Sequence, residues 1–208
     1  MKVLVACEFS GVVRDAFRKR GHDAWSCDLV PTEADEKWHL VGDVFDCIKN
    51  PTFGEPWDML LAFPPCTHLA SSGAVCWPDK QKDGRQQEAI GFIKDLMNAS
   101  IERIAIENPV GILSTLWRKP DQIIHPFQFG NPYMKRTCLW LKNLSPLKPT
   151  NQVEPVAHWH GGVRRGGVKK DGTRTPSRLP TALKYGMKDR SRTFQGIADA
   201  MAKQWGQV

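Results

Sequence analysis

The chain has 208 residues, 41% of them hydrophobic, and a formal net charge of +7 at pH 7. This length suits one domain with its own core, and the hydrophobic content excludes an intrinsically disordered chain. No apolar run approaches the roughly 20 residues that cross a bilayer, and the apolar start meets Glu8 too soon for a signal peptide, so no membrane segment is expected. The six cysteines include no Cys-x-x-Cys pair, which argues against a zinc cluster.

Strands and helices alternate along the first half of the chain. Apolar runs predict strands over 2–7, 23–27, 58–63 and 101–106, and helical periodicity predicts helices over 12–20 and 85–98. Such alternation is typical of a parallel sheet with helices on both faces. The predicted fold class is therefore α/β, with an open, mostly parallel sheet.

The pattern changes beyond residue 120. Strands are predicted over 125–129 and 137–141, joined by Gly130-Asn131-Pro132, and a closing helix over 194–205. The intervening residues are rich in Pro, Gly and basic side chains and lack periodicity, which indicates a long functional loop or a very small lobe. Three parts follow: a main domain over 1–144, a basic insert over 145–192, and a C-terminal helix over 193–208 that returns to the main domain.

The positive charge is concentrated in the insert. Residues 151–192 carry ten basic and three acidic side chains, whereas the rest of the chain is balanced. Such a cluster is typical of a protein that binds a polyanion, with a solvated basic loop as the alternative. His158-Trp159-His160 offers too few ligands for a metal and is expected to stack on nucleic acid. The predicted nucleic-acid-binding residues are Arg164, Arg165, Lys169, Lys170, Arg174 and Arg178.

Polar motifs follow the predicted strands at their carboxyl ends. They are Phe9-Ser10-Gly11, Asp28, Gly42-Asp43-Val44 after a short run at 38–41, Pro64-Pro65-Cys66, and Glu107-Asn108-Pro109. In an open α/β sheet, ligands bind just beyond these ends. Cys66 is therefore placed for chemistry, with two prolines to restrict the backbone before it. The alternative is a buried structural cysteine.

In this order the motifs resemble those of the DNA cytosine-5 methyltransferase family. The resemblance covers about residues 1–142 and a helix near 190–205, and the short insert is similar to that of the small phage and prophage members. It implies a Rossmann-like, S-adenosylmethionine-dependent methyltransferase fold. Residues 1–144 would be the catalytic domain and 145–192 a reduced target-recognition region. A monomer in the cytoplasm of a bacterial or phage-infected cell is expected.

The resemblance implies catalytic roles for three residues. Cys66 would add as a thiolate to carbon 6 of cytosine, which makes carbon 5 reactive toward a methyl donor. Glu107 would share a proton with nitrogen 3 of the ring. Arg136 would contact the cytosine carbonyl. It matches only the last position of the family's Gln-x-Arg-x-Arg pattern, because Pro132 and Met134 stand at the others.

The implied methyl donor is S-adenosyl-L-methionine. Phe9 would cover its adenine, Asp28 would accept from the ribose hydroxyls, and Asp43 from the adenine amino group. Each Asp taken alone is also a common turn or cap residue. The chain has Val12-Val13-Arg14 where the family usually has a further glycine. The implied donor-binding residues are Phe9, Ser10, Gly11, Asp28, Asp43, Val44, Phe63, Ile197 and Ala198.

The leading hypothesis is methyl transfer to carbon 5 of cytosine in duplex or single-stranded DNA, with the base flipped out of a duplex. Because the insert is short, sequence recognition should be short or relaxed. Two alternatives stay open. One is cytosine-5 methylation of RNA, or addition of another electrophile at the same carbon. The other is a catalytically degenerate protein that only binds nucleic acid. No metal is expected.

Overall fold

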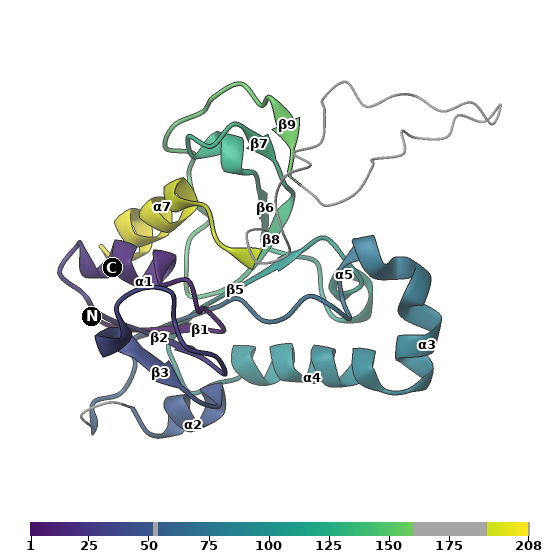
Figure 1. Cartoon of the computed structure of the whole chain (residues 1–208), viewed down its shortest axis with the longest axis horizontal. Coiled ribbons are helices and arrows are strands. Elements are labelled where there is room, and N and C mark those ends of the chain that lie inside the picture. Colours follow the sequence, from purple (N-terminus) through teal and green to yellow (C-terminus); the bar gives the residue numbers. More distant parts are fainter. Residues whose placement is uncertain (52–53, 160–190, 208) are drawn as a thin grey trace.

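A seven-stranded sheet organises the chain, in the order β3-β2-β1-β4-β5-β8-β6 (Figure 1). The computed structural model describes residues 1–51, 54–159 and 191–207. The strands are β1 (Lys2–Ala6), β2 (Asp23–Asp28), β3 (His39–Val41), β4 (Met59–Ala62), β5 (Arg103–Pro109), β6 (Gln122–Ile124) and β8 (Thr137–Lys142). Neighbouring strands are parallel except that β8 runs antiparallel to β5 and β6. The predicted α/β class with a mostly parallel sheet is confirmed.

Helices cover both faces of this sheet (Figure 1). On one face α1 (Val12–Arg18) packs against α7 (Gln195–Trp205), and on the other lie α2 (Val44–Lys49) and α4 (Arg85–Met97). The shorter elements are α3 (Trp77–Lys82), α5 (Leu113–Leu116), and the 3-10 turns η1 (Glu36–Trp38), η3 (Ser71–Cys76) and η4 (Pro126–Gln128). Strands β1 and β4 are buried at every position, as expected for parallel strands that are covered on both faces.

The carboxyl ends of four strands meet at one edge of the sheet. Ala6 of β1 is paired with Cys27 of β2 and with Ala62 of β4, and Ala62 is paired with Ile106 of β5. The loops that follow these four strands therefore leave the sheet side by side. This edge is where open α/β sheets bind their ligands.

The predicted strand over 125–129 is wrong. These residues contain the 3-10 turn η4, which begins at Pro126. Proline has no N–H to donate to a sheet ladder, so it disfavours a strand at this point. The strand lies just before it, as β6, which pairs with β8.

The first part of the insert is more ordered than expected. Strand β9 (Ala157–His158) pairs in parallel with β7 (Tyr133–Met134) to form a second, two-stranded sheet. Leu147 is buried in the main core, where its backbone N–H and carbonyl each bond the Gln122 side-chain amide at 2.7 Å. Residues 145–159 thus pack on the body of the protein. No helix in the described part of the chain is long and apolar enough to span a bilayer.

Candidate functional site

A cavity of about 1440 Å³ lies at the sheet edge where the parallel strands end. Its walls come from the loops that follow β1, β2, β3 and β4, and from β7 and β9 of the second sheet. The predicted site residues that line it are Phe9, Asp28, Asp43, Val44, Phe63, Cys66 and Arg136. One space therefore contains both predicted donor-binding residues and the predicted nucleophile.

Two neighbouring strand ends fix the backbone around Cys66. The side-chain amide of Asn108, at the end of β5, donates to the carbonyl of Pro64 at 2.9 Å. The Cys66 carbonyl accepts from the N–H groups of Leu69 and Ala70 at 3.0 and 2.9 Å. Asn108 is almost fully buried, so this contact ties the turn before Cys66 to the strand that carries Glu107. The sequence motifs point to Glu107 but give Asn108 no such role.

The loop after Cys66 is anchored by side chains from α3 and α4. The Lys80 ammonium, although its side chain is nine-tenths buried, donates to the carbonyl of Thr67 at 2.6 Å. The fully buried Gln86 amide donates to the carbonyl of His68 at 3.1 Å. These contacts satisfy two backbone acceptors next to Cys66, so the loop keeps a defined path.

Burial and two neighbouring charges set the protonation of Cys66 and Glu107. Burial raises the pKa of the Cys66 thiol, Glu107 raises it further, and the Lys135 ammonium lowers it. Burial also raises the pKa of Glu107, and Lys135 opposes this effect. Glu107 therefore keeps its proton to higher pH than an exposed glutamate does. A carboxyl group that keeps its proton is suited to general acid catalysis.

Glu107 lies beside the large cavity. It lines a small neighbouring cavity together with Phe194 and Ile197 of the C-terminal segment. Lys135 and Ser191 line both cavities and so form the boundary between them. Cys66 and Glu107 thus approach this boundary from different sides.

The cation that acts on Cys66 is Lys135, one residue before the predicted Arg136. Arg136 is exposed at the cavity. Burial lowers the pKa of His125, and Arg136 lowers it further. Burial and Glu107 raise the pKa of Cys138 to about 11, against an opposing effect of Arg136. The pattern that predicts Arg136 gives no role to the preceding Lys135, which is half-buried.

The predicted donor end of the cavity combines carboxylates with a neutral thiol. One carboxylate oxygen of Asp43 accepts from the Phe45 N–H at 2.7 Å and caps α2, and Asp28 accepts from the Val30 N–H at 3.3 Å. Both acids therefore have turn or cap roles as well as lining the cavity. Cys7 lines the cavity with them. Burial and the charges of Asp28 and Asp43 raise the pKa of its thiol to about 12.

Gly11 occupies a crowded position at the start of α1. Its φ is 72°, and an added Cβ would lie 2.7 Å from the Ala34 Cβ and 2.8 Å from the Arg14 Nη2. Glycine tolerates both the left-handed backbone and the close approach. The space that a Gly11 side chain would occupy is therefore filled by Ala34 and Arg14. That Ser10 and Gly11 contact the methionine part of a donor stays a prediction.

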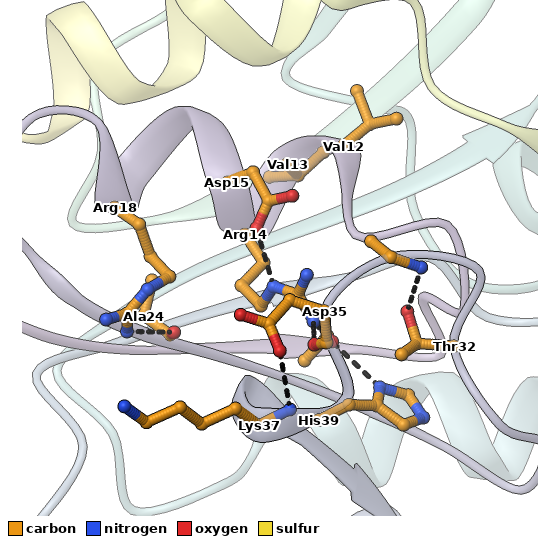
Figure 2. Close-up of polar contacts among 12 residues, drawn as sticks. Val12, Val13, Arg14, Asp15, Arg18, Ala24, Thr32, Asp35, Lys37 and His39 are labelled. Carbon is orange, nitrogen blue, oxygen red and sulfur yellow. Dashed lines mark hydrogen bonds and ion pairs between the residues drawn. The ribbon is translucent and has the colours of Figure 1, made fainter.

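Arg14 joins the loops that follow β1 and β2 (Figure 2). Its fully buried guanidinium donates to the Asp15 carboxylate at 2.8 Å, the Asp35 carbonyl at 3.0 Å and the Ser26 hydroxyl at 3.2 Å. Ser26 also shares a 2.8 Å hydrogen bond with Nδ1 of His39 in β3. Arg14 thus ties α1 to β2 and to the loop that follows β2.

Glu8 is a second buried ionisable residue beside the start of α1. One of its carboxylate oxygens accepts from the Val13 N–H and from the Ser10 hydroxyl, both at 2.9 Å. Burial raises the pKa of Glu8, whereas these hydrogen bonds and the charge of Arg14 lower it. Ser10 therefore holds the Glu8 carboxylate in this structure.

Replacing Arg14 by methionine is expected to lower the free energy of unfolding by about 1–3 kcal/mol, because the buried Ser26 hydroxyl and the Asp35 carbonyl lose their charged donor. Chemical denaturation followed by circular dichroism measures this change. Arg20→Met removes the same charge from an exposed position and should change stability by less than about 0.5 kcal/mol. An Arg14→Met protein as stable as the parent would refute this structural role.

The C-terminal segment packs against the body near Glu107. Ile197 lines the small cavity beside Glu107, whereas Ala198 is fully buried in the core shared with α1. Arg192 pairs with Glu33 through an Nε–Oε2 contact of 3.0 Å, which joins this segment to the loop after β2. Donor contacts from Ile197 and Ala198 stay a prediction.

Trp159 is buried between two aromatic rings, and its stacking on nucleic acid stays a prediction. Its ring centroid lies 4.7 Å from that of Tyr133 and 5.0 Å from that of Phe194. Trp159 and His158 are both buried, although both contribute to the cavity lining. The predicted contacts of His160 and of the basic residues from Arg164 to Arg178 lie outside the described residues.

Within residues 1–51, 54–159 and 191–207, no group of three or more His, Cys, Asp or Glu side chains could hold a metal ion. No family model and no curated protein matches the sequence. Among solved structures, the chain is similar to a candidate DNA modification methyltransferase encoded within an E. coli prophage. The two are 14% identical, with a TM-score of 0.46, over 75% of this chain and 52% of that one. The chain thus spans about half the length of that protein.

Proposed function

We propose that this chain transfers a methyl group from S-adenosylmethionine to carbon 5 of cytosine in DNA. The observation that carries this proposal is the shared cavity, in which Asp28 and Asp43 line the same space as Cys66. Its volume of about 1440 Å³ exceeds the roughly 300–1,000 Å³ that is usual for one small ligand. The cavity therefore has room for a donor and a flipped base together.

The lining residues suit S-adenosylmethionine. Phe9, Val44 and Phe63 offer apolar surfaces for adenine, and Asp28 and Asp43 offer carboxylate acceptors for hydroxyl and amino groups. When bound, this donor supplies an electrophilic methyl group on a sulfonium. The residues that would hold it and the residue that would activate the acceptor come from adjacent strand ends.

Cys66 and Glu107 supply the chemistry of the acceptor. The Cys66 thiolate forms a bond to carbon 6 of cytosine while Glu107 gives its proton to nitrogen 3, so that carbon 5 becomes nucleophilic. Bound S-adenosylmethionine would supply the methyl group to carbon 5. Water would then take the proton from carbon 5, so that Cys66 leaves as a thiolate, the 5,6 double bond is restored, and nitrogen 3 returns its proton to Glu107.

The charge of the chain supports a nucleic acid as the partner, and the resemblance of the motifs to DNA cytosine-5 methyltransferases favours DNA. The whole positive excess lies in residues 151–192, and phosphate contacts of this kind supply affinity without sequence information. Cys66 is half-buried in the cavity, so a cytosine has to leave the duplex to reach it. Base recognition from so short a segment would cover only a few base pairs.

Bisulfite sequencing of plasmid DNA from cells that express the chain tests this proposal. Cytosines in a short shared context should resist conversion, and this protection should vanish with Cys66→Ser. Complete conversion in both samples would refute DNA methylation. Sequencing RNA from the same cells identifies the alternative polymer. A chain that binds DNA but protects neither polymer would be a nucleic-acid-binding protein only.

Replacing Asp43 by serine is expected to weaken S-adenosylmethionine binding by about 1–3 kcal/mol, or roughly 5–150-fold, because the adenine amino group loses a charged acceptor. Serine still caps α2, so the helix should persist. Calorimetric titration measures the affinity. Asp46→Ser is the matched control at an exposed position in the same helix, and it should leave the affinity unchanged. Equal affinities for Asp43→Ser and the parent would place adenine elsewhere.

A further inference from the structure

Lys135 lies at the junction between the two sheets. It directly follows β7, where the Met134 carbonyl accepts from the Trp159 N–H at 2.9 Å. It also precedes β8, whose first residue, Thr137, is paired with Pro109 of β5. Backbone pairing on both sides therefore holds Lys135 close to the strand end that carries Glu107. Its side chain lines the large cavity with Cys66 and the small cavity with Glu107.

The Lys135 ammonium thus lines both the cavity that contains the Cys66 thiol and the cavity that contains the Glu107 carboxyl group, and it acts on the pKa of both. A thiolate and a carboxylate so placed disfavour each other, whereas the ammonium favours one negative charge beside it. With Lys135 charged, the trio is neutral overall when either Cys66 or Glu107 is ionised. Ionisation of both would leave a net negative charge in a buried place, which is costly.

Other ionisable groups also lie around this boundary. Those in the lining of the large cavity are Cys7, Cys27, Asp28, Asp43, His125, Arg136 and His158, and Lys80 bonds the Thr67 carbonyl nearby. The charges that bear on the Cys66 thiol are those of Glu107 and Lys135. Arg192 lines the small cavity but is paired with Glu33.

We propose that Lys135 is a positioning residue that holds a single negative charge on the Cys66–Glu107 pair. The thiolate then forms together with a protonated Glu107, because the proton that leaves Cys66 is the one that Glu107 carries. A cytosine whose nitrogen 3 accepts from the Glu107 carboxyl group favours this state. In this state the Cys66 thiolate can add to carbon 6. The use of the pair in catalysis rests on the proposed function, whereas the charge coupling is a property of the protein alone.

Alkylation of Cys66 by iodoacetamide across a pH series tests the coupling, in the full chain without donor or DNA. Mass spectrometry of the peptide that contains Cys66 reports the rate for this thiol alone. Lys135→Met is expected to move the alkylation profile to higher pH, with the rate near neutral pH falling about ten-fold for each pH unit of the shift. Lys135→Arg should keep the parent profile. Lys135→Gln is a second neutral variant in case Lys135→Met fails to fold.

Two control variants separate Lys135 from a general effect of charge. Lys148→Met makes the same charge change at an exposed, distant position, and Arg136→Met removes the adjacent cation. Both should keep the parent profile. In a Glu107→Gln, Lys135→Met double variant, loss of the carboxylate should offset much of the shift. An unchanged profile in the neutral Lys135 variants, or an equal shift with Arg136→Met, would overturn the inference.

These outcomes are independent of the test of the proposed function. If the alkylation profile shifts as expected but no cytosine resists bisulfite, the coupling stands and the methyltransferase proposal fails. If cytosines are protected but the profile of Lys135→Met matches the parent, the methyltransferase proposal stands and the role of Lys135 fails.

Discussion

Replacing Cys66 by serine is expected to abolish methyl transfer to DNA while the affinity for S-adenosylmethionine stays unchanged. A serine hydroxyl ionises far less readily than a thiol, so it would not form the anion that adds to carbon 6. The bonds from Leu69 and Ala70 to the carbonyl of residue 66, and the bond from Asn108 to the Pro64 carbonyl, use no sulfur atom. The cavity should therefore keep its shape. Transfer of labelled methyl groups to DNA measures the first effect, and calorimetry measures the second.

A covalent trap gives this prediction a second readout. DNA that contains 5-fluorocytosine should form a stable covalent complex with the parent chain, because fluorine at carbon 5 blocks the final elimination. The complex should be missing with Cys66→Ser. Cys76→Ser, the same substitution at an exposed cysteine, should behave as the parent in both assays. Methyl transfer at the parent rate by Cys66→Ser would exclude Cys66 as the nucleophile.

Replacing Glu107 by glutamine is expected to slow methyl transfer by about 10²–10⁴-fold, the usual contribution of a positioned general acid. Glutamine keeps the size and a hydrogen-bond donor, but it has no proton to give to nitrogen 3. Donor affinity should not change, because Glu107 does not line the large cavity that contains Asp28 and Asp43. Single-turnover measurements with DNA in excess isolate the chemical step.

The pH dependence of the same step checks the assignment further. Activity of the parent should rise with pH as Cys66 forms its thiolate, and fall again as Glu107 loses its proton. Burial raises the pKa of Glu107, so the falling limb should lie above the range of an exposed glutamate. Glu107→Gln should lack that limb, whereas the exposed control Glu102→Gln should keep the parent profile. Parent-like rates for Glu107→Gln would remove Glu107 from the mechanism.

The sequence by itself determined the α/β class and the strand ends that contribute to the cavity. The apolar runs that became β1 and β4 are too short for helices and carry no alternation, which is the pattern of strands covered on both faces. Polar residues directly after such strands must lie at one edge of a parallel sheet. For this reason the sequence alone predicts that Asp28, Asp43 and Cys66 lie close together. In the structure all three line one cavity.

Only the tertiary structure decided which distant side chains meet at that edge. The amide of Asn108 holds the Pro64 carbonyl across two strands, and Arg14 joins two loops through the Asp35 carbonyl. Trp159 packs on Tyr133. The cation that lowers the pKa of Cys66 is Lys135 and not the predicted Arg136. Periodicity and strand ends are local properties of a chain. These contacts instead depend on strand register and on how segments far apart in sequence pack, which no local pattern encodes.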